Sequence, residues 1–277
     1  MDQIDVTGGS IGLTTSGTGL ATIDNASAVD LATSTVGDAL SVTAGGTITQ
    51  SGAVTAGGAT TLDAGSNDIT LNSANTFGDL TVTGGAVAIT EDDAITDGGA
   101  WSTGTTPLDA SGNAITLDNI DNDFTGDVVV SNTSDVTIVD ANDIQFGAST
   151  VSGKLDVTAS GQITQNDALD VAGTTTLDAG GTATPDNDIT LENAANNFDS
   201  DGSGDAVTVI QAGDITVGDG DNLTVGQISA GGDVSLEADA NDTGDNTITL
   251  NQTIEANSIT LAGNAGSSSP EAIDLTG

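Results

Sequence analysis

Three successive segments of the sequence, which contain Val42, Leu62 and Val82, repeat with a period of roughly 20 residues, within the range of solenoid repeats. Val42, Leu62 and Val82 are equally spaced along the chain. Three isoleucines follow them at nearly the same spacing: Ile48, Ile69 and Ile89. Each segment holds two short apolar stretches separated by a glycine-rich turn. One such coil cannot bury its apolar face alone, so the period predicts a solenoid in which stacked coils supply the core.

Apolar–polar–apolar triplets recur along the whole chain, as at residues 29–31, 80–82 and 215–217. Alternation with period two predicts short strands with one face inward, and no stretch keeps a helical period, so we expect almost no helix. The fold class predicted is therefore all-β, a β-solenoid with coils of about 20 residues. We expect one domain over residues 1–277 with roughly 13 coils. The serine-rich stretch at residues 263–277 reads as a linker or as the start of a further coil.

A longer repeat overlies the short one. Residues 34–65 align with residues 149–180 at a constant offset of 115, with 19 of 32 positions identical. A third motif, Ile-Thr-Leu followed by Asn and Phe, occurs three times, at residues 69–77, 115–124 and 189–198. The long step from Val82 to Leu108 contains Trp101 and Pro107 and predicts a protruding turn, and a second insertion is predicted around Pro185.

Charge limits the partners that this chain can bind. The 277 residues include 41 acids and one base, Lys154, for a formal net charge of −40. Nothing here can neutralise phosphates, so binding to nucleic acid or to an anionic membrane is not expected. No apolar run reaches the roughly 18 residues of a membrane span, and the first residues lack the pattern of a signal peptide.

The repeats resemble those of large secreted bacterial adhesins of the filamentous-haemagglutinin type. The resemblance rests on the Ile-Thr-Leu…Asn…Phe segments, on Val42–Gln50, and on the Leu-Asp-Ala-Gly turns at residues 62–65 and 177–180. It implies a right-handed parallel β-helix that forms a rigid shaft exported to the cell surface. We therefore expect a structural segment of an extracellular surface fibre, whose partners are further copies joined head to tail or adjoining repeats of a longer chain.

Parallel β-helices also carry enzymes, and the sequence argues against one here. Polysaccharide lyases need a base and cations to stabilise a developing carbanion, and this chain offers one lysine and no arginine. Glycoside hydrolysis needs two carboxylates, but the acids are expected to occupy turns and outward strand positions. We expect no catalytic residues. A threonine-based ice-binding face is disfavoured because the outward residues vary in type.

Aspartates spaced around glycines indicate a second function, the binding of calcium. Asp199, Asp201 and Asp205 alternate with small residues, as loops for hard cations require. Asp219 and Asp221 form a similar but shorter group, and residues 239–245 a weaker one. Solvated turns explain the same pattern, so both interpretations stay open. A calcium- or glycan-binding module on the inserted turns near Trp101 and Pro185 is the alternative to a purely structural role.

Overall fold

The computed structural model describes residues 9–180, 187–238, 246–263 and 272–274, and the strands of this part pair in parallel without any helix. Two units divide the chain, Met1–Thr133 and Ser134–Gly277. In each unit the chain coils through two or three strands and returns to stack on itself. The predicted all-β solenoid is confirmed, whereas the single domain stays a prediction.

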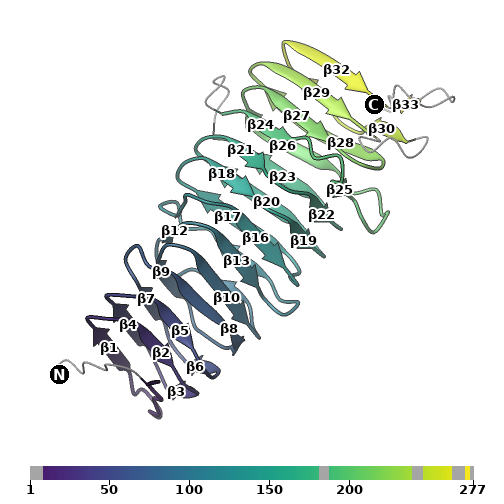
Figure 1. Ribbon diagram of the computed structural model, residues 1–277. Helices are drawn as coiled ribbons and strands as arrows, with labels where there is room; N and C mark the ends of the chain where they lie inside the picture. Colours follow the sequence, from purple (N-terminus) through teal and green to yellow (C-terminus); the bar gives the residue numbers. More distant parts are fainter. Residues whose placement is uncertain (1–8, 181–186, 239–245, 264–271, 275–277) are drawn as a thin grey trace. The chain divides into compact units, whose positions relative to one another are not determined.

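The first unit builds two long sheets and two short ones, and its strands lie side by side at the purple-to-blue end of Figure 1. One sheet has the order β1 (Ala21–Asn25), β4 (Leu40–Ala44), β7 (Thr60–Asp63), β9 (Leu80–Thr83), β12 (Ser102–Thr103) and β15 (Asp123–Phe124). The second has the order β2 (Val29–Leu31), β5 (Ile48–Gln50), β8 (Ile69–Asn75), β10 (Val87–Glu91), β13 (Thr106–Asp109) and β16 (Val128–Ser131). The short pairs are β3 (Ser34–Val36) with β6 (Val54–Ala56), and β11 (Ile95–Thr96) with β14 (Ile115–Leu117).

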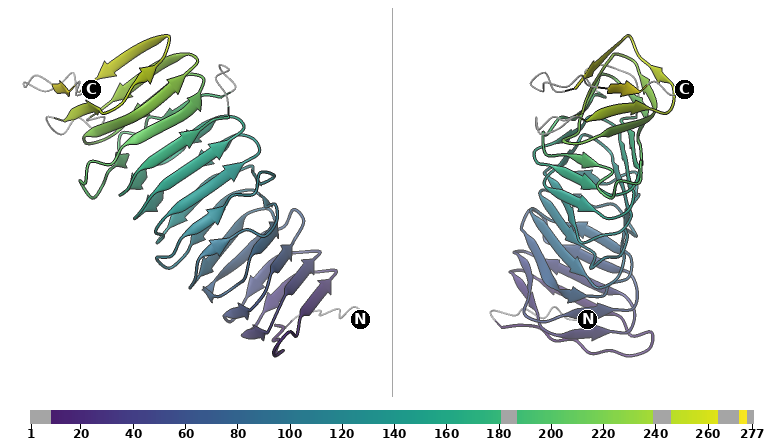
Figure 2. Two further views of the ribbon diagram at one scale, coloured as in Figure 1. Left: turned by 180° about the vertical axis from the view of Figure 1, so that it is seen from behind. Right: turned by 90° about the vertical axis from the view of Figure 1, so that its right-hand side faces the viewer.

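The second unit repeats the arrangement, and both views of Figure 2 show its strands stacked in layers. One sheet has the order β18 (Ile144–Phe146), β21 (Ile163–Gln165), β24 (Ile189–Leu191), β27 (Ile215–Gly218), β29 (Asp233–Glu237) and β32 (Ser258–Ala262). Another has the order β17 (Val136–Asp140), β20 (Leu155–Ala159), β23 (Thr175–Asp178), β26 (Val207–Ala212), β28 (Leu223–Ala230), β30 (Thr247–Leu250) and β33 (Ala272–Asp274), with β31 (Ile254–Glu255) beside β28. The third is β19 (Ser149–Val151), β22 (Leu169–Val171) and β25 (Asn197–Phe198).

Coil length varies more than the sequence period suggested. Ile163 pairs with Ile189, and Thr175 pairs with Val207, so these two coils are longer than the regular coils that join Val42, Leu62 and Val82. Part of the extra length lies in the described turn at residues 199–206, and strands β23 and β26 pair with one register shift after Leu177. Such long coils leave room for fewer turns than the roughly 13 expected.

Inward columns of aliphatic side chains form the core. Val42 pairs with Leu62, and Leu62 pairs with Val82, and all three are fully buried, as predicted. The evenly spaced isoleucines do not form one continuous column. Ile48 pairs with Ile69, but Ile69 pairs with Val87, and Ile89 lies against Leu71. Because side chains alternate between the two faces of a strand, this shift of two residues in the pairing keeps the same side chains pointing inward.

The longer repeat is a repeat of structure as well as of sequence. Strands β3 to β7 and strands β19 to β23 begin at positions that differ by the same offset as the sequence alignment. The two copies lie in different units, so each unit builds this set of coils from its own residues.

Trp101 lies in the core, so the protruding turn predicted around it is wrong. Its side chain is fully buried, and its indole N–H donates to the Leu80 carbonyl oxygen at 3.2 Å. The ring packs 6.4 Å from that of Phe124, tilted by 56°. Pro107 continues strand β13 opposite Val129. The long step to Leu108 therefore holds the short strands β11 and β12 rather than a projection. The insertion with Pro185 lies outside the described residues.

A buried asparagine closes a corner of each coil that carries the third motif. Asn75, Asn122 and Asn196 each stand two residues before the phenylalanine. Their Oδ1 atoms accept the N–H of Val54 at 2.9 Å, of Trp101 at 2.8 Å and of Leu169 at 2.9 Å. Each of these N–H groups lies at or just before the start of a strand on the preceding coil. The asparagines thus satisfy backbone groups that no sheet reaches.

Glutamine completes two of these corners. Gln50 and Asn75 exchange two side-chain hydrogen bonds of 2.9 and 3.1 Å, and Gln165 and Asn196 exchange two of 2.8 and 2.9 Å. At the third corner Asp97 accepts from the Asn122 amide at 2.8 Å. The Ile-Thr-Gln and Asn-x-Phe segments of the sequence motifs are therefore two halves of one buried contact.

Leu62→Asp should destabilise the protein by ~3–5 kcal/mol, because it buries an unpaired carboxylate in the central column. Chemical unfolding measures the change. Thr61→Asp, on the exposed outward face of the same strand, should cost far less. Equal losses for the two variants would contradict the register.

Thr60→Val should stabilise the protein by about 1 kcal/mol, because a methyl group in place of the hydroxyl removes the cost of desolvating a polar group. The hydroxyl of Thr60 is buried without a hydrogen-bond partner, as is that of Thr175 at the equivalent position of the second unit. Thr61→Val, on the exposed face, is the matched control for a thermal melt. A lower melting temperature for Thr60→Val alone would contradict the prediction.

Candidate metal site

Three of the five predicted ligands meet in one turn. Asp199, Asp201 and Asp205 lie in the turn that joins β25 to β26, and each offers a carboxylate oxygen within 4.8 Å of the others. Asp201 is exposed, and the other two are half-buried. The structure therefore brings together the group that the aspartate–glycine spacing indicated.

Backbone contacts anchor the start of this turn. The N–H groups of Asp199 and Ser200 both donate to the Val171 carbonyl oxygen, at 2.8 and 3.0 Å. Asp199 has a φ of 103°, a conformation that non-glycine residues rarely adopt. The turn then reverses through Gly202 and Gly204, whose φ angles of 71° and 87° suit glycine.

Hydrogen bonds inside the turn hold the carboxylates in place. The Gly204 N–H donates to both oxygens of Asp199, at 3.1 and 2.9 Å. Ser203 donates its N–H to Asp201 at 2.8 Å and its hydroxyl to Asp205 at 2.8 Å. These donors offset part of the charge on the three groups without occupying all of their oxygen lone pairs.

The charge of the turn favours a hard cation. Two unit charges about 4 Å apart repel by roughly 1 kcal/mol in water and by about 4 kcal/mol at an effective dielectric constant of 20. Carboxylate and hydroxyl oxygens are the ligands that Ca²⁺ prefers, and Ca²⁺ takes six to eight oxygens, some of them from water. Asp199, Asp201, Asp205 and Ser203 would hold such an ion, which would supply charge neutralisation and cross-link the turn.

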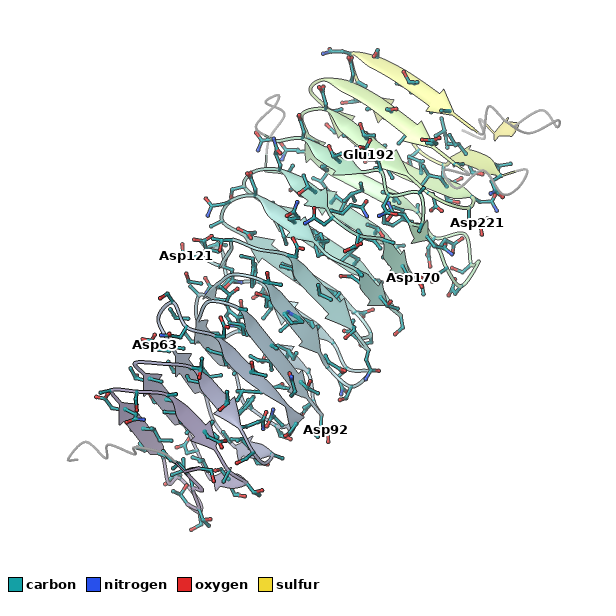
Figure 3. All side chains as sticks on the ribbon, viewed as in Figure 1. Asp63, Asp92, Asp121, Asp170, Glu192 and Asp221 are labelled. Carbon is teal, nitrogen blue, oxygen red and sulfur yellow. The ribbon has the colours of Figure 1, made fainter. Side chains whose placement is uncertain are left out.

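Asp219 and Asp221 do not join this cluster. Asp219 is fully buried, and its carboxylate accepts the N–H of Phe198 and of Asp221, both at 2.8 Å. Burial raises the pKa of Asp219 to about 7; these two donors oppose the rise, and the charges of Asp221 and Asp199 add to it. Asp221 is exposed and accepts the Asn222 N–H at 3.0 Å. Figure 3 shows it at the surface with other labelled acids. The weaker group at residues 239–245 lies outside the described residues.

The sequence predicted that the acids occupy turns and outward strand positions, and three acids do not. Glu91, Asp140 and Asp219 are all buried. Each ends a stretch of alternating residues, at the fifth position of residues 87–91, 136–140 and 215–219. Period-two alternation places that position on the inward face, so strand parity was the signal that could have found them.

In the part of the chain that the structure describes, no helix has the length and apolar character that crossing a membrane requires.

Asp199→Asn/Asp201→Asn should abolish a calcium-dependent rise in melting temperature. Asp63→Asn/Asp178→Asn is a matched control, because it removes two charges from other turns, in which each carboxylate accepts an N–H two residues on, as that of Asp201 does. The wild-type chain and the control should gain stability in millimolar calcium beyond that in sodium chloride of equal ionic strength. Equal effects of the two salts on the wild type would exclude the site and leave screening alone.

Comparison with known proteins gives one family. The model of the family described as repeats of unknown function (DUF5649) matches residues 17–83, 73–131 and 133–205. No curated protein and no solved structure matches the chain. Each matched stretch contains a buried asparagine corner, at Asn75, Asn122 and Asn196. The matches cover well over half of the 277 residues, and the chain therefore belongs to this family of repeats.

Proposed function

We propose that this chain is a structural segment of an extracellular bacterial surface fibre, of the filamentous-haemagglutinin type that its repeats resemble, and that it acts as a rigid spacer. The observation that carries the proposal is the unbroken stacking of coils within each unit. In the described part of each unit, the long sheets run from coil to coil, and their strands pair with strands of the coils before and after them. In such an architecture each further coil lengthens the stack by a similar amount, which suits a shaft.

The side chains support a structural role over an enzymatic one. Most core residues are aliphatic, and the four phenylalanines and Trp101 are all buried among them. The hydrogen bonds of the buried polar corners connect coils to one another. An outward surface dominated by acids and hydroxyl groups keeps a long repeat soluble and resists non-specific association.

Further coils are proposed to continue the stack at β32. Val234 and Ile215 are buried in the column that precedes Ile259, yet Ile259 itself is 47 % exposed. Of the strands that the structure describes, β32 is the last in its sheet, so one row of its backbone groups faces away from β29. Either a second copy of the chain or adjoining repeats of a longer chain would complete the core there. The first case is a head-to-tail contact that gives open filaments.

Calcium binding is a second candidate, favoured by the three clustered carboxylates of Asp199, Asp201 and Asp205. A cation there would rigidify the turn without changing the stack. Glycan binding gains no comparable support, because Trp101 and the phenylalanines are buried and cannot form an aromatic platform for a sugar.

The cellular location has a direct test. Antibodies raised against the purified chain should label intact source cells without permeabilisation, and brief protease treatment of intact cells should remove the signal. Labelling only after permeabilisation would contradict the proposal.

Ile259→Asp should prevent head-to-tail assembly while leaving the fold intact, because Ile259 is half exposed. Ile120→Asp is the matched control, since Ile120 is 77 % exposed elsewhere on the chain. In high salt, which screens the repulsion between acidic copies, sedimentation should show larger species for the wild type and the control only. A wild type that stays monomeric at every salt and protein concentration would rule out self-assembly and leave the longer chain as the source of further coils.

A further inference from the structure

Glu91 occupies an inward position that aliphatic residues fill elsewhere in the strand. It ends β10, in which Val87 and Ile89 also point inward, and its side chain is fully buried. On the preceding coil Glu91 pairs with the corner residue Asn75. Neither carboxyl oxygen makes a hydrogen bond of full geometry, and the backbone N–H of Phe77 favours the charged form only in part. A carboxyl group in such a place is costly in its charged form, because burial removes water that the Phe77 N–H does not fully replace.

The following coil leaves space for this side chain. Thr90 pairs with Asp109 on β13, which brings the buried Ala110 level with Glu91. The order along the column is therefore asparagine, acid and alanine. The small residue accommodates the long side chain of Glu91 between two coils.

The same order recurs in the second unit. There the Asn196 amide donates to the Gly218 carbonyl oxygen at 3.0 Å, as the Asn75 amide donates to that of Thr90 at 3.0 Å. The residue after Gly218 is the buried Asp219, just as Glu91 follows Thr90. Gly218 pairs with Glu237, which brings the buried Ala238 level with Asp219.

A third buried acid agrees in part with this pattern. Asp140 ends β17 and pairs directly with the buried Ala159. Its carboxylate accepts the Asn142 N–H at 2.8 Å. Strands β10 and β17 thus end in a buried acid, and in β27 the acid follows the last residue; each acid lies level with an alanine of the next coil. The buried acid is therefore a recurring part of the coil.

Among the described residues, no positive charge compensates Glu91. The titratable groups around it are Asp92 and Asp93 in its own turn and Asp109 on the paired strand β13. The paired strand β8 and the next strand, β11, contribute no titratable side chain. All of these neighbours are acids, and their charges disfavour ionisation of Glu91.

We propose that Glu91 is a proton switch built into the corner of its coil: protonated, it lets the coil close on Asn75 and Ala110, and ionised, it loosens that corner. The inference rests on the packing of the coil and holds whatever the role of the fibre. Its consequence is a shaft whose coils are tighter in mildly acidic surroundings than in alkaline ones.

The direction of the pH dependence follows from proton binding. Burial raises the pKa of Glu91 from 4.5 to about 8; the nearby Phe77 N–H opposes the rise, and the charge of Asp93 adds to it. Between these values the folded chain holds a proton that the unfolded chain has released. The stability that the carboxyl group contributes is thus fully present below about pH 4.5 and is lost as the pH rises through about 8.

Carboxyl NMR of the wild-type chain tests the titration without any variant. The sequence has five glutamates, so labelling glutamate alone with ¹³C gives five carboxyl signals, and Glu91→Gln assigns one of them. That signal should titrate between pH 7 and 9. A Glu91 signal that titrates near the ordinary value of 4.5 would overturn the proposal.

Melting curves between pH 5.5 and 9 test the consequence for the coil. The melting temperature of the wild type should fall more steeply with rising pH than that of Glu91→Gln, whose neutral amide keeps the shape. Glu192→Gln, the same change at an exposed position, should keep the wild-type slope, which separates the switch from general repulsion among the acids. Equal slopes for the wild type and Glu91→Gln would overturn the proposal.

The Phe77 amide reports on the corner itself. After correction for its intrinsic rate, its hydrogen exchange in the wild type should accelerate at least tenfold from pH 6 to pH 9. In Glu91→Gln it should stay constant within about twofold. Parallel behaviour of the two proteins would show that Glu91 has a packing role only, and would overturn the switch even if the NMR signal were shifted.

Discussion

Parallel pairing between successive coils imposes one constraint on every inward residue: it must fit directly above and below its counterparts on the neighbouring coils. Val42, Leu62 and Val82 meet the constraint with side chains of similar size. The constraint favours aliphatic residues in the columns and confines changes of length to the turns. It explains how the coils that end at Ile189 and Val207 can be longer and still pair from Ile163 and from Thr175 to Leu177, with one register shift after Leu177.

The corners are where the stack needs polar atoms inside. A chain that turns between two sheets leaves backbone N–H groups that face no strand, and Asn75, Asn122 and Asn196 accept three of them. Buried amides of this kind are favourable only when all their partners are present. Next to two of these corners the following coil places a buried carboxyl group, Glu91 or Asp219. Neutral amides on one coil and a buried acid on the next thus meet at the same corner, and the acid makes the corner sensitive to pH.

Period and alternation were enough to predict the fold class, the inward column through Leu62 and the offset between the two long repeats. Period and alternation did not predict features that depend on tertiary packing. Trp101 lies in a long step between repeats, which reads as an insertion, yet its ring fills the core against Phe124. The step from Ile69 to Val87 depends on how tightly one turn closes, which spacing alone does not reveal. At the candidate metal site, the aspartate spacing predicted the cluster of Asp199, Asp201 and Asp205. The spacing could not show that Asp219, also predicted as a ligand, is buried and accepts two backbone N–H groups instead.

Hydrogen exchange of the first amide in each corner is the most direct test of this account. Val54, Trp101 and Leu169 donate to a side-chain oxygen rather than to a strand, and so does Gly65, which donates to Asp63 in an exposed turn. If the asparagine corners hold the coils together, the first three amides should exchange as slowly as the strand amides of Leu62 and Val157, and Gly65 should exchange quickly. Exchange of Val54, Trp101 and Leu169 at the rate of Gly65 would contradict the account.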